Sequence, residues 1–319
     1  MSKLSTEPYK GVRDFYPEDM EVQNYIFNTW RRVAEQFSYK EYSASILEPA
    51  ELYKSKTSEE IVNEQTFIFT DRGGREIVLR PEMTPTLARM VAARRRNLKF
   101  PLRWYSIPNV FRYERPQRGR RREHWQLNCD LLGISGIEAD VEIISLAHAI
   151  MKEFGAENKD FEIRVNDRKL ITDIFNKIGG TSESTNVSVI RLLDRREKID
   201  NFDSELERHL GSDKKEQFLG LLEDTKSNET LEKLRETLNT KNIQNIVIDT
   251  KLARGFDYYT GMIFEVFDNH KDNRRSLFGG GRYDNLLEMF EVEPIPAVGF
   301  GMGDITLRDF LETHGLPLK

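Results

Sequence analysis

The chain has 319 residues, of which 38% are hydrophobic and 32% charged, and its formal net charge is −5. This charge excludes a polycation, so any nucleic-acid contact must come from local basic patches such as residues 94–96 and 112–122. The single cysteine, Cys129, excludes an internal disulfide framework and a cysteine-based zinc site. No stretch reaches the ~20 apolar residues of a membrane span, and the N-terminus carries no apolar signal segment. The sequence therefore favours a cytoplasmic protein without membrane contact.

The N-terminal part mixes helix and strand patterns. Residues 18–37 carry apolar side chains at helical spacing and predict a helix after an extended lead-in. Shorter patterns then predict a strand, a short helix and a hairpin around a glycine turn, over residues 39–48, 51–58 and 66–80.

A strand-to-helix corner follows at residues 80–86. Thr84 suits the N-cap position and Pro85 the first helical position, so a helix is predicted from about residue 86. Side chains at such a corner project into a cleft, where the Glu82 carboxylate could hold an ammonium group. Simple helix capping is an equally good interpretation of Glu82 and Thr84.

The most distinctive stretch is residues 111–133, FRYERPQRGRRREHWQLNCDLLG, which predicts two strands around a turn with five arginines. Successive side chains of a strand point to opposite faces, so Arg112 and Glu114 share one face. Gln126 and Asp130 share one face of the second strand, and both sets can line one cleft. The residues expected to pack behind this face are Phe111, Tyr113, Trp125 and Leu127. Arginine binds phosphate in a planar, bidentate way, although a solvated hairpin tip is the alternative interpretation of the turn.

The middle of the chain predicts a helix over 136–154 and a strand over 161–165. From residue 169 to 245, polar helical segments and glycine loops dominate. We interpret 169–245 as an inserted, mostly helical subdomain. The main domain would then be built from residues 1–168 and 246–319.

The last part combines two strands with three glycine-containing segments. The strands are predicted over residues 246–249 and 263–267. The segments read ARGFDYYTG at 253–261, FGGGRYD at 278–284 and AVGFGMGD at 297–304. Consecutive glycines permit close backbone approach. Asp304 is the predicted N-cap of a C-terminal helix, and a helix N-terminus can bind an anion.

Together these pieces resemble the class II aminoacyl-tRNA synthetases, and the histidyl-tRNA synthetases in particular. FRYERPQRGR resembles the second motif of the class, while RPE-x-T, ARGFDYYTG and GGGRYD resemble histidyl-tRNA synthetase signatures. The resemblance covers nearly the whole chain. It implies an α+β fold, with a class II synthetase-like antiparallel sheet flanked by helices, and a homodimer. It also implies ATP-dependent activation of histidine and its transfer to the acceptor end of tRNA(His).

The resemblance further implies roles for single residues. Those expected to hold histidine are Glu82, Thr84, Gln126, Asp130, Tyr258, Tyr259 and Tyr283. Those expected at ATP are Arg112, Glu114, Arg120, His124 and Arg254. Arg112 and Arg254 would meet at the α-phosphate, and with Gln126 they are the expected catalytic residues. Those expected at the tRNA acceptor end are Arg115, Gln117 and Arg118. Mg²⁺ is expected to arrive with ATP, with no metal site in the protein itself.

Three positions depart from the family's pattern. The third motif normally ends with an arginine at the γ-phosphate, where this chain has Thr306, and Arg120 or Arg308 could compensate. His124 replaces the usual phenylalanine on adenine, and Ser45 replaces the proline of the first motif, a position that belongs to the expected dimer interface. The chain also ends just past the third motif. We therefore expect a catalytic core without the family's anticodon-binding domain, or else a natural short form.

An alternative function follows from these departures. A non-catalytic, histidine-sensing paralogue would resemble the regulatory subunit of ATP phosphoribosyltransferase and would also lack the anticodon domain. Thr306 and the short chain favour this alternative. The retained arginines Arg112, Arg120 and Arg254, together with Gln126, favour the enzyme.

Overall fold

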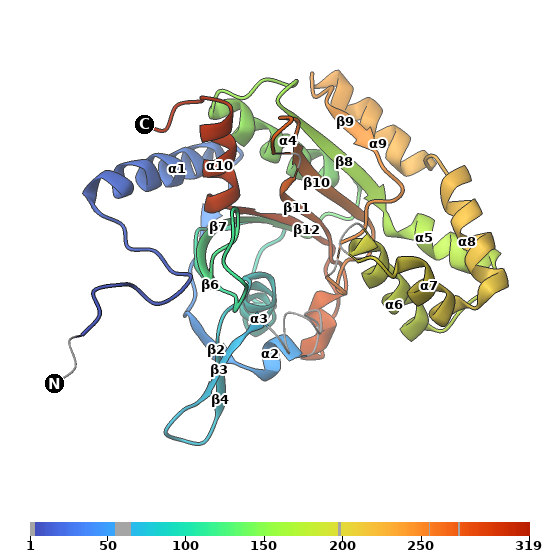
Figure 1. Cartoon of the computed structure of the whole chain (residues 1–319), viewed down its shortest axis with the longest axis horizontal. Coiled ribbons are helices and arrows are strands. Elements are labelled where there is room, and N and C mark those ends of the chain that lie inside the picture. The colour runs from blue at the N-terminus through green and yellow to red at the C-terminus, as the bar shows by residue number, and fades with distance from the viewer. Residues whose placement is uncertain (1–3, 55–64, 197–198, 255, 274) are drawn as a thin grey trace.

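The computed structural model describes residues 4–54, 65–196, 199–254, 256–273 and 275–319 (Figure 1). Within them a nine-stranded sheet lies at the centre of the fold. Its strands, in spatial order, are β1 (Lys40–Glu41), β5 (Leu102–Ser106), β7 (Glu123–Leu132), β12 (Ala297–Gly303), β11 (Ser276–Arg282), β10 (Met262–Asp268), β8 (Phe161–Asp167) and β9 (Ile246–Ile248), with β6 (Asn109–Phe111) paired to β7. The central strands pair antiparallel, as predicted. Only the edge pairs among these strands, β1 with β5 and β8 with β9, are parallel.

The basic hairpin forms from β6 and β7, with Phe111 opposite Glu123. Leu127 and the free thiol of Cys129 are buried in the core behind it. The prediction that Tyr113 packs there is wrong, since 49% of its surface is exposed. The cause is that the chain leaves β7 after Phe111. The Tyr113 amide donates to the carbonyl of Gln65 instead, at 2.6 Å.

The predicted single strand over 39–48 is also wrong, because this segment divides between two sheets. Its first part is β1, whereas β2 (Leu47–Pro49) joins a small sheet with β4 (Glu76–Leu79) and β3 (Phe67–Thr70). Arg80 explains the break, since its Nη1 donates to the carbonyls of Ala44 and Ser45 at 2.8 and 3.2 Å. The β3–β4 hairpin confirms the predicted glycine turn. The predicted helix over 51–58 is present as α2 (Glu51–Lys54), and its remainder lies outside the described residues.

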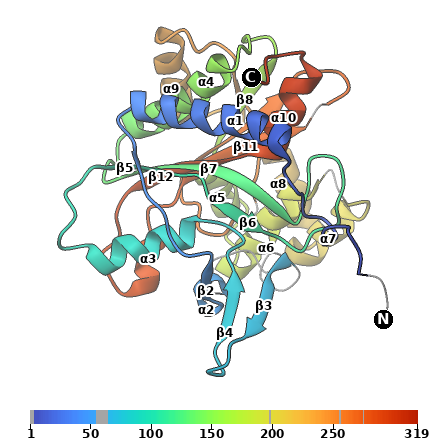
Figure 2. The ribbon, with the colours of Figure 1, turned by 90° about the vertical axis from the view of Figure 1, so that its left-hand side faces the viewer.

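One face of the large sheet is covered by α1 (Pro17–Gln36), α4 (Ile137–Glu153), α9 (Glu229–Thr240) and α10 (Asp304–Thr313) (Figure 2). Their apolar stripes and the sheet share one buried core, which includes Trp30, Ile144 and Phe310. Leu231, Leu234 and Leu238 of α9 belong to this same core, although α9 falls within the predicted inserted region. No helix in the described ranges is both long and apolar enough to cross a membrane.

The helices α5 (Arg168–Lys177), α6 (Glu183–Asp194), α7 (Phe202–Leu210) and α8 (Ser212–Asp224) form the lobe at the right of Figure 1. They share a hydrophobic cluster of their own, in which Phe175 stacks on Phe218 at 5.3 Å between ring centroids. The division into 1–168 plus 246–319 and 169–245 stays a prediction, and the packing of α9 on the main core argues for an earlier end of the insertion.

The other face of the sheet carries α3 (Thr84–Arg94) and η3 (Leu286–Phe290), packed around a cluster that includes Tyr258, Tyr259 and Tyr283. The prediction that Thr84 is the N-cap of α3 is wrong by one residue. Met83 is the N-cap, because its carbonyl already accepts from the Leu87 amide at 2.9 Å. Thr84 is therefore the first helical residue, and helix capping does not explain it.

Asp304 is likewise not the N-cap of α10, a position that Gly303 occupies. Its buried carboxylate accepts from the Trp125 amide at 3.0 Å and the Gln23 side chain at 3.1 Å. It also pairs with Arg13 at 2.7 Å. Asp304 thus fixes the start of α10 against β7, α1 and the N-terminal lead-in.

Candidate active site

A cavity of about 250 Å³ opens between β7, β12 and the two segments that flank β10. Every residue predicted to hold histidine or ATP lines it: Glu82, Thr84, Arg112, Glu114, Arg120, His124, Gln126, Asp130, Arg254, Tyr258, Tyr259 and Tyr283. The structure therefore brings together side chains from five separate parts of the sequence. Their roles toward substrates stay predictions.

The strand β7 supplies the floor of the cavity. His124, Gln126 and Asp130 occupy alternate positions and point to one face, as a pleated strand requires. The neighbouring strand β12 leaves room for them, since Asp130 lies opposite Gly299 and Gln126 opposite Gly303. A Cβ atom added at Gly299 would overlap the Asp130 carboxylate. The glycines of AVGFGMG therefore make space for polar side chains of the next strand.

One end of the cavity holds a buried acid among tyrosines. The Tyr283 hydroxyl donates to Oδ1 of Asp130, a residue that is only 3% exposed. Burial raises the pKa of Asp130 to about 7, against the opposing effect of the Tyr283 hydrogen bond. Nearby, the Tyr258 hydroxyl donates to Oε2 of Glu82 at 2.9 Å. Such a pocket suits a small ring that bears both hydrogen-bonding and positively charged groups.

The other end of the cavity carries guanidinium groups. Arg254 Nη1 donates to Oε1 of Glu265 at 3.0 Å, and Ser276 Oγ donates to the same oxygen at 2.6 Å. Arg254 Nε is buried without a hydrogen-bond partner among the described residues. Arg112 Nε donates to the Pro81 carbonyl at 2.9 Å, which ties the hairpin to the corner before α3. The two guanidinium groups expected at one phosphate thus open on the same cavity.

His124 is held in its neutral form. Burial, and then the positive charges of Arg112 and Arg13, lower the pKa of His124 to about 3. A neutral imidazole presents an aromatic face without a charge, which is the property needed to stack on a base.

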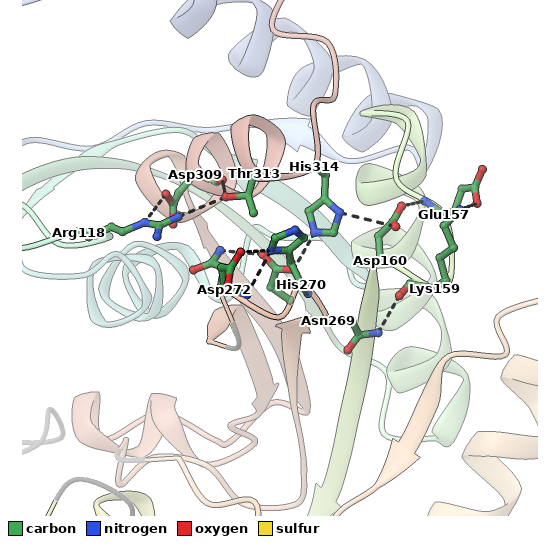
Figure 3. Close-up of polar contacts among 12 residues, drawn as sticks. Arg118, Glu157, Lys159, Asp160, Asn269, His270, Asp272, Asp309, Thr313 and His314 are labelled. Carbon is green, nitrogen blue, oxygen red and sulfur yellow. Dashed lines mark hydrogen bonds and ion pairs between the residues drawn. The ribbon is translucent and has the colours of Figure 1, made fainter.

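The three residues predicted at the tRNA acceptor end lie outside this cavity. Arg118 reaches α10, where its Nε donates to Asp309 at 2.9 Å and its Nη2 to Thr313 at 3.3 Å (Figure 3). Gln117 and Arg118 line an adjoining cavity of about 1070 Å³. Arg115 lines neither of these two cavities.

Glu265 and Ser276 are functional candidates that the sequence reasoning missed. Glu265 is the only acid within the otherwise apolar run 262–267, and this isolation was an available signal. Ser276 gives no comparable signal, because a serine at the start of a strand is common. Within the described part of the chain, no group of three or more His, Cys, Asp or Glu side chains is placed to hold a metal ion.

Comparisons with known proteins show one family over nearly the whole chain. A family model described as histidyl-tRNA synthetase matches residues 11–305. A histidine–tRNA ligase of Leptospira biflexa is 43% identical, and the match covers 98% of this chain and 76% of the relative. The corresponding protein of Thermoplasma volcanium is 40% identical over the same shares. A solved structure from Bacillus halodurans C, described as an ATP phosphoribosyltransferase regulatory subunit/histidyl-tRNA synthetase, has a TM-score of 0.80 and 26% identity. That match covers 98% of this chain and 84% of the Bacillus chain.

Proposed function

Because the chain belongs to the histidyl-tRNA synthetase family, we propose that it activates histidine with ATP and transfers it to tRNA(His) in the cavity described above. The observation that carries this proposal is the meeting of two arginines and a buried acid–tyrosine pair in one small cavity. ATP is a substrate of this reaction, and Mg²⁺ enters bound to it. A homodimer, tRNA contacts at Arg115, Gln117 and Arg118, and a cytoplasmic location are further parts of the proposal.

Histidine binding follows from the acid-rich end of the cavity. The Asp130 carboxylate and the Tyr283 hydroxyl face the imidazole, and Glu82 faces the α-ammonium group. A site built on buried hydrogen-bonding groups rejects analogues that lack the matching groups, by as much as ~10⁴–10⁵. Gln126 lies between Asp130 and His124 along β7, where its amide can orient the histidine carboxylate.

The chemistry asks for charge neutralisation more than for a protein nucleophile. The histidine carboxylate attacks the α-phosphorus of ATP, and the P–O bond to pyrophosphate breaks. Arg112 and Arg254 stabilise the charge that develops on the α-phosphate oxygens. In the second step, a ribose hydroxyl at the tRNA 3′ end attacks the histidyl carbonyl carbon, and AMP leaves.

The whole proposal is tested by ATP–pyrophosphate exchange and by tRNA charging with the 319-residue chain. We expect exchange that depends on histidine, together with formation of histidyl-tRNA(His). Histidine and ATP binding without any exchange would contradict the enzyme and support the histidine-sensing paralogue. The histidine–tRNA ligases of Leptospira biflexa and Thermoplasma volcanium, at 43% and 40% identity, favour the enzyme over this second candidate.

Replacing His124 with phenylalanine should change the KM for ATP by no more than roughly threefold, because both side chains offer a neutral ring. His124→Ala should raise this KM roughly tenfold or more, since stacking on a base contributes ~1–3 kcal/mol. The KM for histidine is the internal control and should stay constant in both variants. A loss in His124→Phe as large as in His124→Ala would assign His124 a hydrogen-bonding role instead.

A further inference from the structure

We propose that Arg275 binds the pyrophosphate end of ATP, an inference that rests on the function proposed above. In this role Arg275 replaces the arginine that the family's third motif normally places at the γ-phosphate. This chain has Thr306 at that position, and Thr306 lines the cavity. Three observations support this role: the direction of the cavity, the surroundings of Arg275 and the contacts of the other arginines nearby.

The strand registers fix the direction of the cavity. Asp130 lies opposite Gly299 on β12, whereas Gln126 lies opposite Gly303, at the end where α10 begins. β11 runs antiparallel to β12, with Phe278 opposite Met302, so the residue before Ser276 lies at the Gly303 end. In the proposed complex, histidine lies toward Asp130 and the α-phosphate of ATP lies at Arg254 and Arg112. The β- and γ-phosphates therefore extend in the opposite direction, toward Arg275.

The adjoining cavity of about 1070 Å³ continues the first one in this direction. The two cavities share Gly119, Arg120, Glu265, Ser276 and Thr306 in their linings. Arg275 lines the second cavity, immediately beyond the shared residues. Its guanidinium group also lies close to Thr306. A Cβ atom added at Gly119 would overlap Arg275 Nη1 and would touch Thr306 Cγ2 at 3.9 Å.

Arg275 is oriented but not neutralised by its neighbours. Nη1 donates to the Arg118 carbonyl at 3.0 Å and lies 4.0 Å from Oδ2 of Asp309. Both of the side-chain contacts found for Arg275 in the described part of the chain use this one nitrogen. The side chain is 33% exposed, so its other N–H groups can reach a phosphate. Asp309 is shared with Arg118, which approaches it more closely, at 2.9 Å (Figure 3).

Of the other arginines considered for this role, Arg308 is less well placed, whereas Arg120 is a second candidate. Arg308 pairs with Glu312 at 2.8 Å and with Asp19 at 3.9 Å, and it contributes to neither lining. Arg120 lines both cavities and lies 3.6 Å from Glu114, so it can act beside Arg275. Thr306 itself serves as a brace. Its hydroxyl donates to the Leu277 carbonyl at 2.7 Å and fixes the start of β11, the strand that Arg275 immediately precedes.

The competing explanation is that Arg275 only braces the loop that contains Arg118. Calorimetric titration separates the two roles, because AMP lacks the β- and γ-phosphates. In the Arg275→Ala variant of the full chain, we expect the Kd for pyrophosphate and for MgATP to rise roughly tenfold to hundredfold, the range for a hydrogen bond to a charged group. The Kd for AMP and for histidine should stay within about twofold. Arg308→Ala is the matched control and should leave all four constants unchanged.

A second variant tests whether position matters or only charge. Thr306→Arg placed in the Arg275→Ala background should recover most of the lost pyrophosphate affinity. Unchanged pyrophosphate affinity in Arg275→Ala would overturn the inference, and so would an equal loss for AMP and ATP. If the wild-type chain binds pyrophosphate but catalyses no exchange, the proposed function is contradicted. The pyrophosphate affinities of the wild-type chain and Arg275→Ala would still test the role of Arg275.

Discussion

Replacement of Arg254 by alanine should lower histidine-dependent ATP–pyrophosphate exchange by roughly 10³ or more, while the Kd for histidine changes only a few-fold. An arginine that stabilises a transferring phosphoryl group contributes ~10³–10⁵ to the rate, because its charge meets charge that develops in the transition state. Arg254 has the surroundings for this task. Its side chain is only 14% exposed and is oriented by Glu265. The measurement is exchange kinetics beside histidine titration on the same preparation.

Two further variants separate catalysis from folding. Arg254→Lys keeps a positive charge but loses the planar pair of donors. We therefore expect its exchange rate to fall nearly as far as that of Arg254→Ala. Arg32→Ala removes an exposed arginine that pairs with Glu153 at 2.8 Å, and it should leave exchange unchanged. If Arg254→Ala loses histidine binding together with exchange, or unfolds at the assay temperature, Arg254 is a structural residue and its assignment as catalytic is wrong.

The basic hairpin and the cavity floor could be predicted because they follow from local patterns, whereas the large antiparallel sheet was implied by the family resemblance. Alternation along 124–131 assigned Gln126 and Asp130 to one face, and the register of β7 with β12 places both in the cavity. The resemblance then added the tyrosines and Arg254, which lie more than a hundred residues away. No local pattern indicates that such distant segments meet.

The wrong predictions for residues 39–48, Tyr113 and Asp304 share one physical cause, which is a distant partner. The predicted strand over 39–48 is interrupted because the Arg80 guanidinium donates hydrogen bonds to the carbonyls of Ala44 and Ser45. Asp304 would be an ordinary N-cap if Arg13 and Gln23 did not reach its carboxylate. In each case the residue type suits the local role that was predicted. A tertiary contact from elsewhere in the chain provides a better partner.

The two departures from the family's pattern that line the cavity lie together at its nucleotide end. A Cβ atom added at Gly303 would lie 3.6 Å from Thr306 Oγ1 and 3.8 Å from His124 Cδ2, so both replaced side chains flank one glycine. The histidine end keeps its acid and its three tyrosines. Substitution is therefore concentrated where neighbouring arginines can replace a lost contact. It spares the buried pair of Asp130 and Tyr283, which we propose selects the amino acid.

Replacement of Asp130 by asparagine should abolish most histidine activation and yet stabilise the empty protein above pH 7. The loss in kcat/KM for histidine should be about 10⁴-fold, because the imidazole then meets no carboxylate in a buried site.

The stability effect follows from the pKa of Asp130, which burial raises to about 7. An unfolded aspartate has a pKa of about 3.9. The folded protein thus binds the proton more tightly, and its stability falls as pH rises from about 4 through about 7.

Thermal unfolding of the ligand-free protein at pH 5 and pH 8 measures this effect. The wild-type chain should lose more stability over this interval than Asp130→Asn, which has no proton to release at this position. Tyr283→Phe is the informative companion, because the Tyr283 hydrogen bond lowers the pKa of Asp130. Its removal should shift the loss of stability to higher pH, with a smaller fall in activation than in Asp130→Asn.

Asp140 is the control that shows whether the stability change in Asp130→Asn comes from removing a buried acid that has no cationic partner. It is also a buried acid whose pKa burial raises, to about 6, but it pairs with Arg282 at 2.8 Å and does not line the cavity. Asp140→Asn should therefore destabilise the protein, because it leaves the buried Arg282 charge without this partner. If Asp130→Asn behaves in the same way, or keeps exchange within tenfold of the wild-type chain, Asp130 is a packing residue. Opposite stability changes in the two variants would instead support the proposal that Asp130 is held without a cationic partner, at a cost to folding, for the ring that it binds.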